Sequence, residues 1–246
     1  PDYAVTGVQT CALPIWDASA FFDALKRAEP LVESIPTFDG LELEAYRHPI
    51  NHTRQFPDQD VFLVSTDDKE VYVSEGRLVK AWLNVGGKGD DSVRNFRVLT
   101  FLKRLDKLAA VNPTYLPRIH EYGLAARSGS MYLVTDVVDG ATWADAAIDD
   151  ADKLGVIEKL TDAVEHLHGL GISHGDLHPG NVMLGREHGN VYLIDIPDFS
   201  HNTAEAKNHR YSPENIDGSS SEQRDIFAVL RMSCELLGLE WSEESK

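Results

Sequence analysis

The chain has 246 residues, of which 42% are hydrophobic and 26% charged, and its formal net charge at pH 7 is −17. This length and composition indicate a globular protein with one domain or two lobes, while the acidity argues against general binding to nucleic acid or to an anionic membrane surface. No apolar run reaches the ~20 residues that span a bilayer and no secretory signal is visible, so we expect a cytoplasmic location.

The N-terminal residues are predicted to be foreign to the protein. The segment Val5–Ile15 reads as the translation of a common short-read sequencing adapter. We therefore expect residues 1–15 to be an artefact that takes no part in the fold. Residues 16–39 are predicted to form an N-terminal helix and linker, limited by two prolines. The apolar positions with helical spacing are Phe21, Phe22, Leu25 and Leu31.

From residue 40 the pattern changes to strands. Val61–Val64 and Val71–Val73 flank a turn-forming Asp-Asp pair, and Leu78–Val85 follows as a third strand. A glycine-rich loop over 86–91 ends in a helix N-cap. A helix is predicted beyond it from the apolar stripe Val93, Phe96, Leu99, Leu102 and Leu105. Later, Met131–Val134 reads as a buried strand that leads into a hinge.

A helical pattern over Leu154–Leu170 brings the chain to its most informative stretch. This is His174–Asn181, which is followed by the short apolar strands Val182–Leu184 and Val191–Asp195. A hairpin of this kind places two carboxylates and an amide at one end. Phosphate transfer from ATP needs such a set, because one carboxylate orients the attacking hydroxyl while an amide and a second carboxylate hold Mg²⁺.

The same stretch resembles the protein kinase family. His174, Asp176, Leu177 and Asn181 match the catalytic-loop pattern H-x-D-L-x-x-x-N, and Asp195 stands where the Asp of the D-F-G element belongs. Two later segments add to the resemblance. Tyr211–Glu214 is similar to the A-P-E element, and Asp225 begins a segment similar to the buried helix whose Asp supports the catalytic loop.

The resemblance covers about residues 41–246 and implies an α+β, two-lobed protein-kinase-like fold. A small β-rich lobe is expected over 40–138 and a helical large lobe over 139–246. The large lobe is expected to be incomplete, because the chain stops soon after the helix that carries Asp225.

The resemblance also implies roles for individual residues. Asp176 would be the base or hydroxyl-orienting group, and Asn181 and Asp195 the Mg²⁺ ligands. Lys80, on the strand that begins at Leu78, would clamp the phosphates of ATP. The adenine would bind the hinge backbone at Asp136 and Val138, with Thr135 lining the back of the ATP site.

The chain also departs from the family pattern. No G-x-G-x-x-G covers the phosphates, and Arg47–Pro57 occupies its place. Alignment puts Val98 at the helix position whose Glu pairs with the strand Lys, leaving Asp90 or Asp91 as distant substitutes. Gly175 stands where many members carry an arginine that senses phosphorylation, so we expect activity that does not depend on it.

Three functions remain open. The first is a Ser/Thr protein kinase that uses ATP and Mg²⁺ and acts on a protein substrate. The second is a small-molecule phosphotransferase of the aminoglycoside type, whose catalytic loop resembles His174–Asn181, including His178. The third is a pseudokinase that serves as a binding or scaffolding module, favoured by the missing G-x-G-x-x-G loop over the phosphates and the missing helix Glu. The oligomeric state is left open.

Overall fold

A computed structural model describes residues 43–48, 61–83, 85, 92–125, 129–186, 189–196, 210–213 and 219–241. The adapter-like segment 1–15, the predicted helix within 16–39 and the loop over 86–91 lie outside these residues. The same holds for most of Arg47–Pro57, of which only the first two residues are described.

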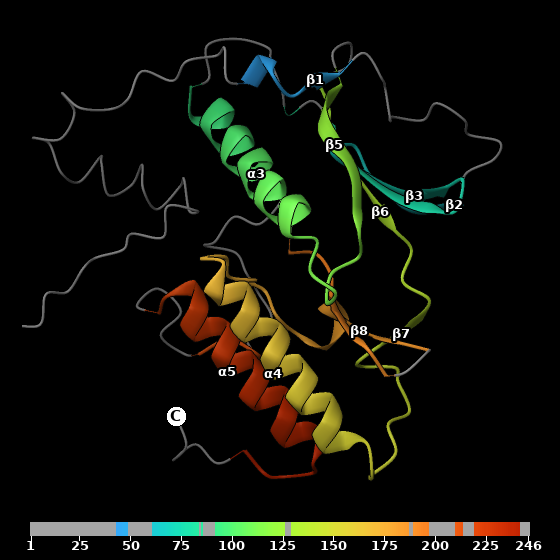
Figure 1. Ribbon diagram of the computed structural model, residues 1–246, viewed down its shortest axis with the longest axis vertical. Coiled ribbons are helices and arrows are strands. Elements are labelled where there is room, and N and C mark those ends of the chain that lie inside the picture. Colours follow the sequence, from blue (N-terminus) through green and yellow to red (C-terminus); the bar gives the residue numbers. More distant parts are fainter. Residues whose placement is uncertain are drawn as a thin grey trace, which may run out of the picture.

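A six-stranded sheet in the order β1-β5-β6-β4-β3-β2 forms one end of the molecule (Figure 1). Its pairs are antiparallel apart from the parallel pair of β1 and β5. The strands predicted around the Asp-Asp turn and before the hinge are confirmed. The strands are β1 (Arg47–His48), β2 (Val61–Ser65), β3 (Lys69–Ser74), β4 (Arg77–Trp82), β5 (Ile119–Ala125) and β6 (Met131–Asp136).

Helix α3 (Ser92–Val111) packs against this sheet, and we call the sheet and α3 the small lobe. The predicted apolar stripe is confirmed in the part whose side chains are described, because Leu99, Leu102 and Leu105 are all buried. The indole of Trp82 on β4 meets the ring of Phe101 edge to face, with centroids 5.2 Å apart. The core of the small lobe therefore forms where one face of α3 packs against one face of the sheet.

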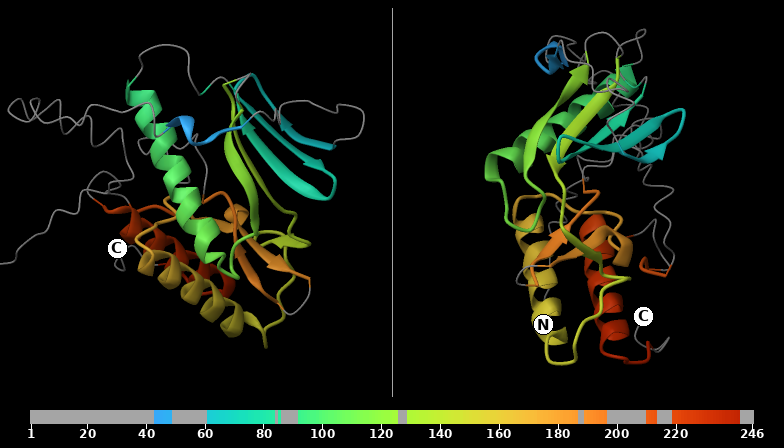
Figure 2. Two further views of the ribbon diagram at one scale, coloured as in Figure 1. Left: turned by 45° about the horizontal axis from the view of Figure 1, so that its top comes forward. Right: turned by 90° about the vertical axis from the view of Figure 1, so that its right-hand side faces the viewer.

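The remaining elements form what we call the large lobe. Helices α4 (Lys153–Gly169) and α5 (Ser221–Leu236) lie side by side, and a three-stranded sheet packs next to them (Figures 1 and 2). That sheet has the order β7-β8-β9. Its strands are β7 (Gly140–Thr142), β8 (Val182–Gly185) and β9 (Val191–Leu193), and the short 3₁₀ helix η2 (Pro179–Asn181) precedes β8.

The core of the large lobe also includes Leu108 from the small lobe. Leu108 of α3 is fully buried among residues of α4, α5 and the β8–β9 hairpin. The C-terminal half of α3 therefore packs into the large lobe. The other members of this core include Val156, Leu160, Val164, Leu167, Ile172, Leu177, Val182, Leu193, Ala228 and Met232.

The chain passes from one lobe to the other through the hinge, residues 136–139, which joins β6 to β7. The predicted α+β, two-lobed architecture is confirmed, while the lobe limits 40–138 and 139–246 stay predictions. Among the described residues, none of the helices combines the length and the apolar character needed to cross a membrane.

Candidate active site

The catalytic loop, residues 174–178, is held in place by hydrogen bonds to α5. The backbone N–H groups of His174 and Gly175 donate to the two carboxylate oxygens of Asp225, at 2.7 and 2.8 Å. Asp225 is fully buried, and His168 of α4 lies 2.9 Å from the same carboxylate. Gly175 has φ +84°, a backbone conformation that side chains disfavour. The loop that carries Asp176 is thus fixed by a buried carboxylate, as the resemblance implies.

His174 ties this loop to the strand that ends at Asp195. Its Nε2 lies 2.9 Å from the carbonyl oxygen of Ile194, so this nitrogen carries the proton and donates. Burial lowers the pKa of His174 to about 4, because the low-dielectric surroundings disfavour the imidazolium. The neutral ring therefore acts as a fixed hydrogen-bonding link between two segments of the site.

Asn181 makes the second link. Its side-chain Nδ2 donates to the backbone oxygen of Asp176 at 2.9 Å, and its own carbonyl accepts from the N–H of Ile194 at 2.9 Å. The amide oxygen of this buried side chain is then the end left to bind a cation. The structure thereby brings the segments carrying Asp176, Asn181 and Asp195 together, as the spacing of the motif predicts.

Lys80, on β4, lies next to Asp195. Its ammonium forms an ion pair with the carboxylate of Asp195. Asp195 has φ +62°, a conformation that is uncommon outside glycine and is found at functional sites more often than elsewhere. Both residues and Thr135 line a small cavity of about 40 Å³. Three of the predicted site residues, from both lobes, thus meet at one place.

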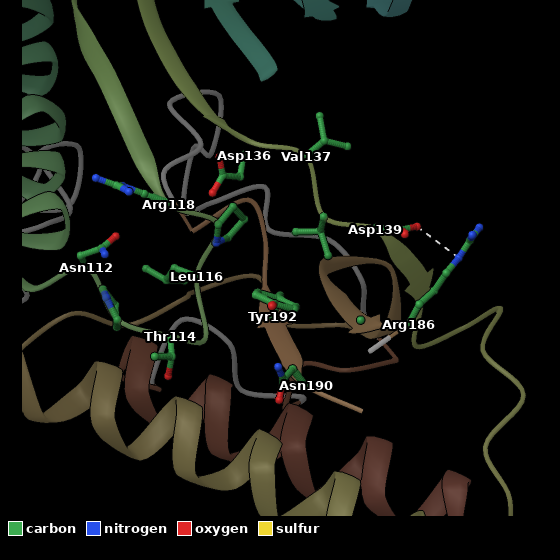
Figure 3. Close-up of a pocket in the computed structure, with 14 residues that line it drawn as sticks. Asn112, Thr114, Leu116, Arg118, Asp136, Val137, Asp139, Arg186, Asn190 and Tyr192 are labelled. Atoms are coloured by element: carbon green, nitrogen blue, oxygen red, sulfur yellow. Dashed lines mark ion pairs between the residues drawn. The ribbon is translucent and has the colours of Figure 1, made fainter. Parts of the chain in front are cut away.

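The hinge residues Asp136 and Val138 line a different, larger cavity of about 650 Å³ (Figure 3). It lies between the hinge, the loop Asn112–Arg118 and the β8–β9 hairpin, and an ion pair of 3.1 Å joins Asp139 to Arg186 at its edge. The residues predicted to bind phosphate, metal or the acceptor do not line it, namely Lys80, Asp176, Asn181 and Asp195. Lys80 and Asp195 line the small cavity instead, and Asn181 is tied to the residue before Asp195 by the hydrogen bond from Ile194.

Backbone bonding at Asp136 limits how the hinge can meet a ligand. Its N–H donates to the carbonyl of Arg118 at 3.0 Å, and its carboxylate lies 2.6 Å from His120. The backbone carbonyl of Asp136 already accepts from the hydroxyl of Thr135 at 3.1 Å, and its second lone pair could accept from an adenine.

The helix α3 does not supply an acid to Lys80. Val98, which alignment puts at that position, is fully buried in the core of the small lobe. The acidic residue of α3 is Asp106, and it accepts hydrogen bonds from the hydroxyls of Tyr46 and Tyr122. Asp90 and Asp91 lie outside the described residues. Among the described residues, Asp195 is an acidic partner of Lys80, and α3 contributes none.

Sequence reasoning missed Arg104, also on α3. Its Nη2 donates to the backbone carbonyl of Ser173, immediately before the catalytic loop. Burial lowers the pKa of this guanidinium to about 10, although the charge of Asp225 raises it. A charged residue between the buried Leu102 and Leu105 was the available signal, since such a residue is costly to bury without a partner.

His178 lies beside the catalytic carboxylate. Its Nδ1 accepts from the N–H of Gly180 at 3.0 Å and so caps η2, and its Nε2 lies 3.8 Å from Oδ2 of Asp176. No cluster of three His, Cys, Asp or Glu side chains that could hold a metal occurs in the described part of the chain.

The segment similar to A-P-E is described only up to Pro213, so Glu214 lies outside. Tyr211 donates to Glu235 of α5 at 2.7 Å, and Arg210 and Arg231 each pair with the same carboxylate at 2.8 Å. Burial opposes the ionisation of Glu235, but these hydrogen bonds outweigh it and lower its pKa. The segment is thus anchored to α5.

No family model matches the chain, but curated proteins and solved structures do. It is 29% identical over 139 residues to myosin light chain kinase A of Dictyostelium discoideum, which covers 52% of this chain and 44% of that protein. It is 32% identical over 141 residues to ribosomal protein S6 kinase alpha-3 of Homo sapiens, covering 55% and 18%. It is also 32% identical over 71 residues to serine/threonine-protein kinase Pkn1 of Myxococcus xanthus, covering 28% and 10%. The chain spans less than half the length of each of these relatives.

Among solved structures, Rad53 1-466 in complex with AMP-PNP matches with a TM-score of 0.52 and 18% identity, covering 72% of this chain and 46% of that chain. The maize SIRK1 kinase domain bound to AMP-PNP matches with a TM-score of 0.51 and 14% identity, covering 82% and 72%. These two likenesses show the fold. The chain therefore has a protein-kinase-like fold, and parts of its sequence are similar to protein kinases.

Proposed function

We propose that this protein transfers the γ-phosphate of MgATP to a hydroxyl group, and that the hydroxyl belongs to a Ser or Thr of a protein. The observation that carries the proposal is the convergence of Asp176, Asn181 and Asp195 at one end of the β8–β9 hairpin, facing Lys80. In this proposal the attacking hydroxyl oxygen bonds to the γ-phosphorus, the bond to the bridging oxygen breaks, and ADP leaves.

Asp176 is assigned to the acceptor hydroxyl. Its side chain is 15% exposed, and its backbone is held between the Asp225 contacts and the side chain of Asn181. A carboxylate held in this way orients the hydroxyl and takes its proton as the new bond forms. It does so without moving, which keeps the cost of reorganisation low.

Asn181 and Asp195 are assigned to Mg²⁺. An amide oxygen and a carboxylate are hard ligands of the kind that Mg²⁺ prefers, and two protein ligands are enough because the remaining positions go to water and phosphate oxygens. When bound, the ion neutralises charge on the phosphates. Lys80 would exchange its partner Asp195 for a phosphate oxygen. The adenine would be held by the carbonyl of Asp136 and the N–H of Val138, with Thr135 behind it.

The choice of a protein acceptor is supported by the relatives, which include proteins named as Ser/Thr kinases. A small-molecule acceptor is the second candidate. The observation that favours it is His178, which lies next to Asp176 in a loop that reads as in the aminoglycoside enzymes.

The full chain should be given ATP labelled at the γ-phosphate, in parallel with a mixed protein substrate and with aminoglycosides and small alcohols. We expect label on Ser and Thr of the protein substrate. Label on the small molecules alone would move the assignment to the second candidate. No transfer to any acceptor would leave a nucleotide-binding or scaffolding module instead.

A further inference from the structure

The C-terminal half of α3 presents three residues to the large lobe from one helix face. Arg104, Lys107 and Leu108 are spaced i, i+3 and i+4, which places their side chains together. Leu108 is buried in the core of the large lobe. Lys107 donates from Nζ to the carbonyl of Leu170 at 2.8 Å, and Arg104 donates to the carbonyl of Ser173. This helix face therefore binds both ends of the short segment Leu170–Ser173 by hydrogen bonds.

The segment Leu170–Ser173 connects α4 to the catalytic loop. Leu170 caps the C-terminus of α4, where unpaired carbonyls and the helix dipole attract cations. Ser173 directly precedes His174, whose N–H is bonded to Asp225. Any shift of Ser173 would therefore move the backbone that carries Asp176, only three residues away.

The positive charge of Arg104 also compensates the buried negative charge of Asp225. Asp225 is a fully buried carboxylate, and a buried charge is tolerated only when hydrogen bonds and opposite charge compensate it. The charges of Arg104 and Asp225 act on one another, and Arg104 in turn lowers the pKa of His174. Its Nε is buried and has no hydrogen-bond partner among the described residues. A buried donor without a partner is unfavourable, so its presence here points to a role for the rest of the Arg104 side chain.

We propose that Arg104 is a positioning residue, which couples α3 to the catalytic loop by holding Ser173 and balancing the charge of Asp225. The role of Asp176 in this inference rests on the proposed function. The coupling itself rests only on the contacts. In this chain the helix is anchored to the large lobe, whereas Lys80 is paired with Asp195.

The test uses the full chain and three variants. Arg104→Met removes the cation and its donors, Arg104→Lys keeps the charge, and Lys103→Met removes an exposed cation from the neighbouring position of α3. Hydrogen exchange at the amides of His174 and Gly175 is read first, because it needs no activity. We expect Arg104→Met to speed their exchange about tenfold, the factor for one hydrogen bond to a charged group. Lys103→Met should leave it unchanged, and Arg104→Lys should restore most of the protection.

Steady-state kinetics of phosphate transfer are the second measurement. Arg104→Met should lower kcat for phosphate transfer about tenfold while the KM for MgATP stays within about twofold, because Lys80 and Asp195 are untouched. Equal exchange in Arg104→Met and Lys103→Met would overturn the proposal, as would faster exchange throughout the small lobe or a loss confined to KM. If Arg104→Met does not fold, Arg104→Gln is compared with Lys103→Met in its place. If the wild-type chain transfers no phosphate, the proposed function fails, and the exchange reading still decides the role of Arg104.

Discussion

At the scale of single residues, His174 makes the site sensitive to acid. In the folded chain its pKa is lowered from 6.5 to about 4 by burial, so between these values the unfolded chain binds a proton that the folded chain excludes. The stability contributed by the neutral ring is complete above pH 6.5 and is lost as the pH falls to 4. The shift corresponds to about 3 kcal/mol. In urea titrations, the free energy of unfolding of His174→Gln should therefore fall by about 3 kcal/mol less than that of the wild type between pH 6.5 and 4. An equal fall in both proteins would contradict this assignment.

At the scale of elements, the pairing of β7 with β8 depends on the absence of a side chain at Gly140. A Cβ added there would lie 2.1 Å from the carbonyl oxygen of Leu184, a backbone atom that cannot move alone. We expect Gly140→Ala to destabilise the fold by about 1–3 kcal/mol, as overpacking does. The matched control is Gly155→Ala on α4, where nothing lies within 4 Å. It should raise stability by about 0.5–1 kcal/mol, since alanine favours a helix. A Gly140→Ala protein as stable as the wild type in urea unfolding would show that β7 can move.

Elements also show where sequence reasoning succeeds. The helix α4 and the hairpins were predictable from local periodicities and turns, whereas α5 was expected from the resemblance to the family. The strand β5 was not, since Ile119–Ala125 has a glycine and two charged or polar positions within seven residues. The contact of Arg104 with Ser173 joins residues 69 positions apart, and a single sequence contains no local signal for such a pair.

At the scale of the whole molecule, the order of the motifs predicted the two lobes, and the fold confirms them. The spacing within His174–Asn181 also predicted which segments would meet, because a hairpin fixes them together. What the motifs could not predict is how α3 packs against the large lobe. That packing depends on contacts of Leu108, Lys107 and Arg104 with residues far away in the sequence.

The central claim is that Asp176 acts on the acceptor while the nucleotide is held by other residues. The most direct test is the rate of γ-phosphate transfer by Asp176→Asn at saturating MgATP, compared with the wild type and with Asp162→Asn, which alters an exposed carboxylate on α4. We predict a loss of about 10²- to 10⁴-fold in Asp176→Asn alone, the range for removing a general base. A transfer rate in Asp176→Asn close to that of Asp162→Asn would contradict the account.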